Sequence, residues 1–86
     1  MNDAGGCTVT VDLGIALAGQ VADAQYRRPK IKMRLERPIT LDCLIRRLGI
    51  PGAHISFITI NGEKCGWDTL VAPNDAIVLF PYVTGG

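Results

Sequence analysis

The chain has 86 residues, 48% hydrophobic and 20% charged, with a formal net charge of +1, a balance typical of one small globular domain and not of a disordered segment. No apolar run approaches the ~18 residues of a membrane span, and residues 1–6 have neither the basic nor the apolar region of a secretory signal. We therefore expect a single cytoplasmic domain over residues 1–86, with residues 1–6 disordered.

Two segments in the first half of the chain alternate polar and apolar residues, the period-two pattern of half-buried strands. They are residues 8–13 and residues 30–36. One face of each strand must be solvated, which favours an antiparallel or mixed sheet covered on one side. The irregular stretch between them, residues 14–29, fits either a long loop or a loop with a short helix. Its two glycines have the spacing of a phosphate-binding loop, but the Lys and Ser or Thr that such a loop needs are missing.

The clearest helix signal follows Pro38. Thr40 is placed as the N-cap, Gly49 is a natural residue for the helix end, and Ile39 can pack on the first helical turn. The apolar residues at helical spacing are Leu41, Leu44, Ile45 and Leu48. We expect a short amphipathic helix.

The remaining strands follow the helix. Residues 55–60 are rich in β-branched and aromatic side chains and end at the turn signal Asn61-Gly62. We expect a short edge strand within residues 63–71, around residues 67–71, followed by a turn at residues 73–75 and a closing strand at residues 76–80. One helix after a strand pair can bury its apolar stripe only on the sheet. The predicted fold is an α+β roll, with four to five strands in a mixed sheet and one main helix on one face, and this order resembles the β-grasp, or ubiquitin-like, fold.

The cysteines and the histidine give no sign of a metal or catalytic site. Cys7, Cys43 and Cys65 are odd in number and far apart, which argues against a disulfide framework, so we expect packing residues. Together with His54 they lack the close ligand spacing of structural zinc sites. No triad partners surround His54, which we expect to be a surface or capping residue.

Residues 27–47 hold eight basic residues against only Glu36 and Asp42. Such a segment could steer an acidic partner or contact phosphates. We favour a solvated strand face plus a charged helix end. Nucleic-acid binding is disfavoured because Tyr26 is the one aromatic at hand for stacking.

Four features together resemble the MoaD/ThiS family of ubiquitin-like sulfur carriers, over most of the chain from about Thr8 onward. They are the helix running into Leu48-Gly49-Ile50, the turn at residues 60–63, the run at residues 73–79, and the end Phe80-Pro81-Tyr82-Val83-Thr84-Gly85-Gly86. The last of these resembles the molybdopterin-synthase small subunit, whereas Trp67 and the turn also fit thiazole carriers. The sequence departs from the family at Asn74, commonly Gly, and at Tyr82, often Pro.

The resemblance implies that the functional group is the Gly86 carboxylate. A ubiquitin-activating-type enzyme (MoeB/ThiF-like) would adenylate it with ATP and Mg²⁺ of its own, so the chain would bind no cofactor or metal. A sulfur donor such as a cysteine desulfurase or rhodanese would then produce a thiocarboxylate. Val83, Thr84 and Gly85 would form a flexible tail of roughly 13 to 14 Å with Gly86, narrow enough for a partner's channel. Phe80, Pro81 and Tyr82 would dock the partners.

The implied role is that of a carrier and not an enzyme. Its sulfur acceptor would be the large subunit of molybdopterin (or tungstopterin) synthase, or alternatively thiazole synthase in thiamin synthesis. Two other classes stay open. One is a protein modifier, whose activated Gly86 is joined to lysine amines. The other is a β-grasp module that binds RNA or protein. We expect no membrane partner in any of these roles.

Overall fold

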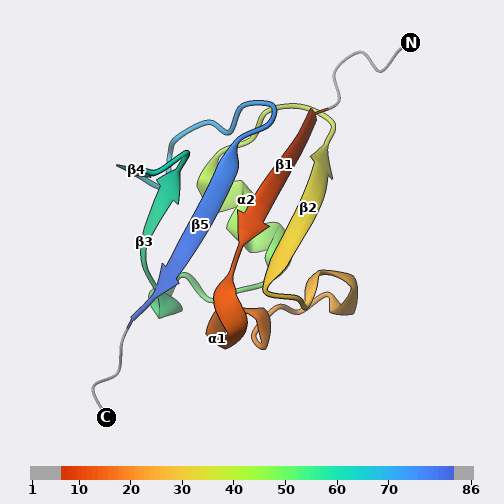
Figure 1. The fold of residues 1–86 in the computed structure, drawn as a ribbon, viewed down its shortest axis with the longest axis vertical. Coiled ribbons are helices and arrows are strands. Elements are labelled where there is room, and N and C mark those ends of the chain that lie inside the picture. The colour runs from red at the N-terminus through yellow and green to blue at the C-terminus, as the bar shows by residue number, and fades with distance from the viewer. Residues whose placement is uncertain (1–6, 83–86) are drawn as a thin grey trace.

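The computed structural model describes residues 7–82. Its elements are β1 (Cys7–Asp12), α1 (Gly14–Ala18), β2 (Lys30–Leu35), α2 (Leu41–Leu48), β3 (Ile55–Ile60), β4 (Glu63–Cys65) and β5 (Ala76–Pro81), with short 3-10 turns at Ala24–Tyr26 and Gly52–His54. The strands form one sheet in the order β2-β1-β5-β3-β4 (Figure 1). Only β1 and β5 are parallel neighbours. This mixed five-stranded sheet with one main helix confirms the predicted β-grasp roll.

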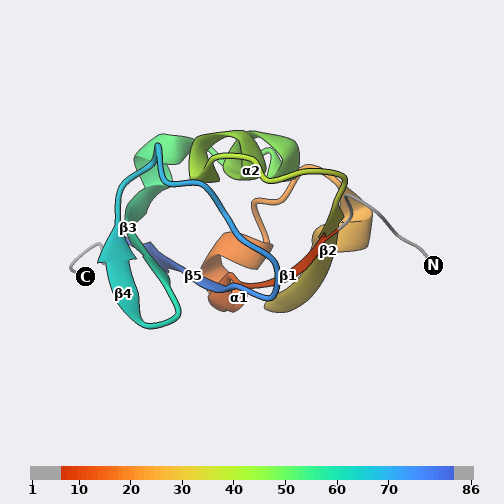
Figure 2. The same ribbon diagram turned by 90° about the horizontal axis from the view of Figure 1, so that it is seen from above.

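The molecule has two layers, with α2 lying across one face of the sheet (Figure 2). The alternation in β1 and β2 places every second residue of each strand in the core, between the sheet and α2. Leu41, Leu44, Ile45 and Leu48 supply the buried stripe of the helix. The opposite face of the sheet, called the outer face below, is therefore left for other contacts.

Both predicted caps of α2 are confirmed. The Thr40 hydroxyl accepts a hydrogen bond from the Cys43 backbone N–H at 3.2 Å, which satisfies one of the free donors of the first turn. Gly49 ends the helix with φ 76°, in the left-handed region that glycine tolerates. A Cβ at Gly49 would also lie 2.5 Å from the Cβ of Ala22. Glycine is thus required here for the backbone conformation and for the close approach of the preceding loop.

The short edge strand predicted within residues 63–71 is confirmed, but it is β4, at Glu63–Cys65, and does not lie around residues 67–71 as expected. Asn61 and Gly62 have φ of 54° and 87°, as in a two-residue hairpin turn, so the chain pairs with β3 directly after them. The carbonyls of Trp67 and Thr69 instead accept hydrogen bonds from the first N–H groups of α2, at 2.9 and 3.0 Å. Since those N–H groups have no partner within the helix, this segment is used to complete α2.

Residues 14–29 contain a short helix, one of the two alternatives left open by the sequence. α1 buries Leu17 and Ala18 and leaves Ile15 exposed. The Arg27 guanidinium holds the following loop by donating to the carbonyls of Val21 and Ala22, at 3.1 and 3.3 Å. No helix within residues 7–82 is long and apolar enough to cross a membrane.

Candidate functional site

The outer face is defined by the residues that alternate with the core in each strand. In β5, Ile77 and Leu79 are buried in the core, so Val78 and Phe80 face outward. The strand register sets Thr59 beside Val78 and Phe57 beside Phe80. The other members of the outer face are Thr8, Thr10, Asp12, Lys30, Lys32, Arg34, Lys64 and Ala76.

The apolar part of this face centres on two aromatic rings. Phe57 and Phe80 stack with 4.3 Å between ring centroids and 8° between ring planes. The Lys64 ammonium lies 4.9 Å from the centroid of the Phe57 ring, close enough for a cation–π contact. Both rings are half-buried, so each keeps apolar area for a partner. The structure therefore places Phe80 on the outer face of the sheet and not in the core.

Phe57 was not predicted as a site residue. The signal that could have found it is cross-strand pairing, because a strand residue opposite Phe80 shares its face of the sheet. That pairing depends on a register shift between Ile55 and Phe57 in β3. The sequence of β3 alone does not reveal such an irregularity.

Pro81 and Tyr82 lie beside the end of β5. Pro81 is half-buried, whereas Tyr82 is 60% exposed and its backbone N–H donates to the carbonyl of His54 at 3.3 Å. These two residues line an open hollow of about 440 Å³ with Ala16, Gln20, Ala53 and His54. His54 is exposed, and its Nδ1 contacts the side-chain oxygen of Gln20, which confirms its prediction as a surface residue.

The predicted terminus lies outside the described residues. This applies to Val83, Thr84, Gly85 and Gly86, as it does to the predicted disorder of residues 1–6. Their roles therefore stay predictions. The structure contributes the strand that leads to them and the surface beside that strand.

A buried carboxylate fixes the start of β5, and the sequence did not predict it. Asp75 is 9% exposed, and its two oxygens accept hydrogen bonds from the Asn61 side chain at 2.9 Å and the Ala72 backbone N–H at 2.7 Å. The Asn61 side-chain oxygen in turn accepts from the Ala76 backbone N–H at 2.9 Å. Asn74 has φ 67°, in the left-handed region that Asn tolerates, at a position where MoaD/ThiS proteins commonly have Gly. This network ties the β3–β4 turn to β5, the strands that carry the aromatic pair.

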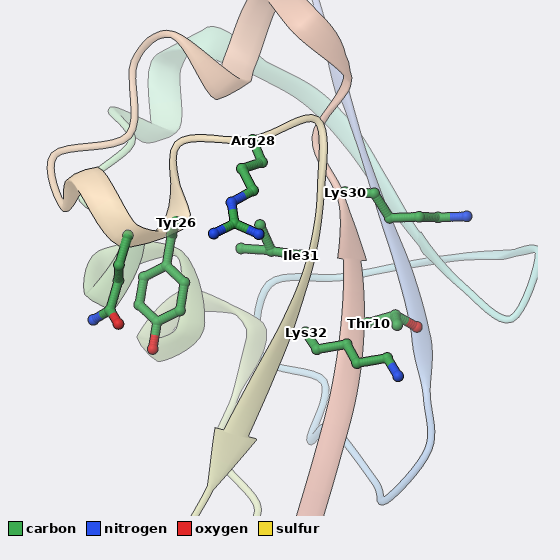
Figure 3. Close-up of a pocket in the computed structure, with 7 residues that line it drawn as sticks. Thr10, Tyr26, Arg28, Lys30, Ile31 and Lys32 are labelled. Carbon is green, nitrogen blue, oxygen red and sulfur yellow. The ribbon is translucent and has the colours of Figure 1, made fainter.

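The basic residues of the segment 27–47 do not form one surface. Arg46 and Arg47 lie on α2, and Arg27 is used within its loop. Near β2, an open hollow of about 490 Å³ is lined by Thr10, Gln25, Tyr26, Arg28, Lys30, Ile31 and Lys32 (Figure 3). Gln25 also donates two hydrogen bonds to the Asp23 carboxylate. The bond from its side chain, and to a smaller extent the bond from its backbone N–H, lower the pKa of Asp23.

The three cysteines are free and differ in environment. Cys7 is buried and Cys65 is half-buried, with its sulfur 3.7 Å from the Ile58 carbonyl oxygen. The prediction of a packing role is wrong for Cys43, which is exposed because it lies off the apolar stripe of α2. Within the described part of the chain, no three His, Cys, Asp or Glu side chains converge to hold a metal ion.

Comparison with known proteins identifies the family. The family described as Mut7-C ubiquitin matches residues 8–85, nearly the whole chain. The chain belongs to the Mut7-C ubiquitin family. No curated protein matches this member of the family.

Solved structures similar to this Mut7-C ubiquitin protein come from Haloferax volcanii. The crystal structure of SAMP1 is 20% identical, with a TM-score of 0.63, over 92% of this chain and 99% of that one. A crystal structure of small archaeal modifier protein 1 is 18% identical, with a TM-score of 0.65, over 90% and 99%. The solution structure of the HVO 2177 protein is 21% identical, with a TM-score of 0.69, over 100% and 92%. These likenesses show the shared ubiquitin-like fold.

Proposed function

We propose that this protein is a ubiquitin-like sulfur carrier of the MoaD/ThiS type, whose Gly86 carboxylate is activated and converted to a thiocarboxylate. The observation that carries the proposal is the position of the stacked Phe57–Phe80 pair. It lies on the outer face of the sheet, on the strand β5 that leads directly into the sequence ending Gly85-Gly86. A partner that docks on this pair is therefore close to the point where the tail begins.

The chemistry needs a partner because a carboxylate is a poor electrophile. In the first step, a Gly86 oxygen attacks the α-phosphorus of ATP, and pyrophosphate leaves. A persulfide of the sulfur donor then attacks the acyl carbon, so that a C–S bond forms as the C–O bond to AMP breaks. A thiol finally reduces the sulfur–sulfur bond and releases the thiocarboxylate. The activating enzyme supplies ATP, Mg²⁺ and the catalytic groups, while this chain supplies the acyl group and the docking surface.

The proposed acceptor is the large subunit of molybdopterin or tungstopterin synthase, because Phe80-Pro81 before the glycine pair resembles the small subunit of that enzyme. Thiazole synthase is the alternative acceptor. In either case the nucleophilic thiocarboxylate sulfur attacks the acceptor's substrate, and water then hydrolyses the acyl C–S bond, so that the sulfur stays on the substrate and Gly86 returns to the carboxylate. The carrier can then be activated again.

A second candidate function is protein modification. It is favoured by the structural likeness to a protein described as small archaeal modifier protein 1. The activation step is the same, but a lysine amine attacks the acyl carbon of the adenylate, so that an amide bond forms as the C–O bond to AMP breaks. The acceptor, and not the fold, separates the two functions. A β-grasp module that binds RNA or protein without activation is the remaining alternative.

Pyrophosphate exchange tests the proposal. The purified ubiquitin-activating-type enzyme from the same cells is incubated with ATP, labelled pyrophosphate and this protein. We expect label in ATP only when the chain is present with Gly86 as its free terminus, and none with a Gly86-deleted control. Exchange that persists with the deleted form, or is absent with the intact chain, would refute activation at Gly86.

A further inference from the structure

The outer face of the sheet is basic around the aromatic pair. It carries Lys30, Lys32, Arg34 and Lys64 against Asp12 alone, a net charge of +3. The whole chain has a formal net charge of +1, so the rest of the sequence is net negative. Such an asymmetry orients the molecule in the field of a charged partner.

Lys30 and Lys32 are the cations of this face that the fold does not use. Both are exposed, and neither side chain has a hydrogen bond or an ion pair within residues 7–82. By contrast, Arg46 pairs with Asp42 at 3.3 Å. Asp12, the cross-strand neighbour of Lys30, accepts a hydrogen bond from the Gly14 backbone N–H at 3.2 Å. The two ammonium groups are thus available to a partner.

The lysines and the aromatic pair belong to one continuous surface. Figure 3 shows Lys30, Lys32 and Thr10 on the same side of β2, whereas Tyr26 and Arg28 lie on its other side. An open hollow of about 390 Å³ joins the two lysines to β5, and its lining is Thr10, Asp12, Lys30, Lys32, Ala76, Ile77 and Val78. Val78 precedes Phe80 by two residues on the same face of the strand. A partner seated on the aromatic pair can therefore reach both lysines.

We propose that the outer face docks an acidic surface of the activating enzyme, with Lys30 and Lys32 as the residues that guide it onto the aromatic pair. This inference rests on the proposed function and adds the chemistry of the partner surface. Exposed charges at the rim of an interface act mainly on the rate of association and on its salt dependence. A single-stranded nucleic acid is disfavoured because the aromatics near these lysines are not free to stack on bases: Phe57 already stacks on Phe80 and contacts the Lys64 ammonium, and Tyr26, which lines a hollow with both lysines, is half-buried.

The pyrophosphate exchange assay with the activating enzyme measures this guidance. We expect the double variant Lys30→Gln/Lys32→Gln to raise the KM for the carrier roughly fivefold at low salt, with kcat unchanged. The difference should vanish near about 1 M salt, where the screening length falls to about 3 Å. The variant Lys30→Arg/Lys32→Arg should restore the KM. Arg46→Gln/Arg47→Gln, which removes the same charge from α2, is the matched control and should stay close to the unmodified chain.

The possible results separate the two proposals. If the intact chain supports exchange but the lysine and arginine doubles shift the KM equally, or neither shifts it, guidance by Lys30 and Lys32 is refuted and activation stands. If the intact chain supports no exchange, the proposed function fails and this inference with it. A separate experiment, an NMR titration of the intact chain followed through its backbone amide shifts, identifies the class of ligand that the two lysines bind. A hexaglutamate peptide that perturbs Lys30 and Lys32 supports the proposal, whereas stronger perturbation by a uridine hexanucleotide overturns it.

Discussion

The rings of Phe57 and Phe80 lie nearly parallel, 4.3 Å apart between centroids and 8° between planes, on the sheet face opposite α2. Offset or stacked aromatic pairs contribute about 0.5 to 1.5 kcal/mol beyond the area they bury. The pair therefore adds modestly to stability while it remains half-exposed. Its larger importance is the flat apolar surface that it presents beside the end of β5.

Phe80→Ala should separate docking from folding. Because the ring is only half-buried, we expect the free energy of unfolding to fall by about 1 to 2 kcal/mol, less than the 3 to 5 kcal/mol of a fully buried Phe. The KM in the pyrophosphate exchange assay should rise by at least about tenfold, since a central aromatic contact is lost. Leu79→Ala, on the core side of the same strand, should show the opposite balance. Equal loss of stability and docking in Phe80→Ala would contradict the interface role.

Asn61 and Asp75 should behave as a coupled pair. Removal of the Asp75 side chain leaves the Ala72 N–H and the Asn61 amide without their acceptor, which should cost about 1 to 3 kcal/mol of unfolding free energy. Asn61→Ala should cost a similar amount, and the double variant less than the sum, by about 0.5 kcal/mol or more. Urea denaturation of the three variants measures the cycle. Strictly additive losses would show that the two side chains act independently.

Gly49→Ala and Gly62→Ala should differ, although both glycines have positive φ. Alanine in the left-handed region costs about 1 to 2 kcal/mol at either position. At Gly49 the new Cβ also meets the Cβ of Ala22, whereas nothing lies within 4 Å at Gly62. We expect Gly49→Ala to destabilise the fold by about 1 to 3 kcal/mol more than Gly62→Ala. Thermal melts with equal losses would contradict the close approach of the loop to α2.

The parts of the fold that depend on local signals could be predicted from the sequence. The strand β3 has the predicted bounds, β1, β2 and β5 differ by one residue at their ends, and Thr40 and Gly49 cap α2 as expected. These features follow from period-two alternation and from capping chemistry, which act over a few residues.

The missed features depend on contacts between distant segments. The carbonyls of Trp67 and Thr69 pair with α2, so the edge strand forms earlier, at β4. Phe57 faces outward because of its register against β5. Lys30 and Lys32 are separated from Arg46 and Arg47 because the chain passes from the sheet to the helix between them. Local patterns do not contain this information, since the topology alone determines which residues share a face.

The most direct test of the carrier function is the intact mass of the untagged protein isolated from its own cells, with a Gly86-deleted form as the control. We predict a fraction in which one oxygen is replaced by sulfur, confined to the C-terminal peptide that ends at Gly86 and absent from the control. Gly86 joined through an amide bond to lysines of other proteins would instead identify a modifier. A chain that continues beyond Gly86, or one whose terminus carries neither sulfur nor a lysine linkage even when the sulfur acceptor is deleted, would contradict the account.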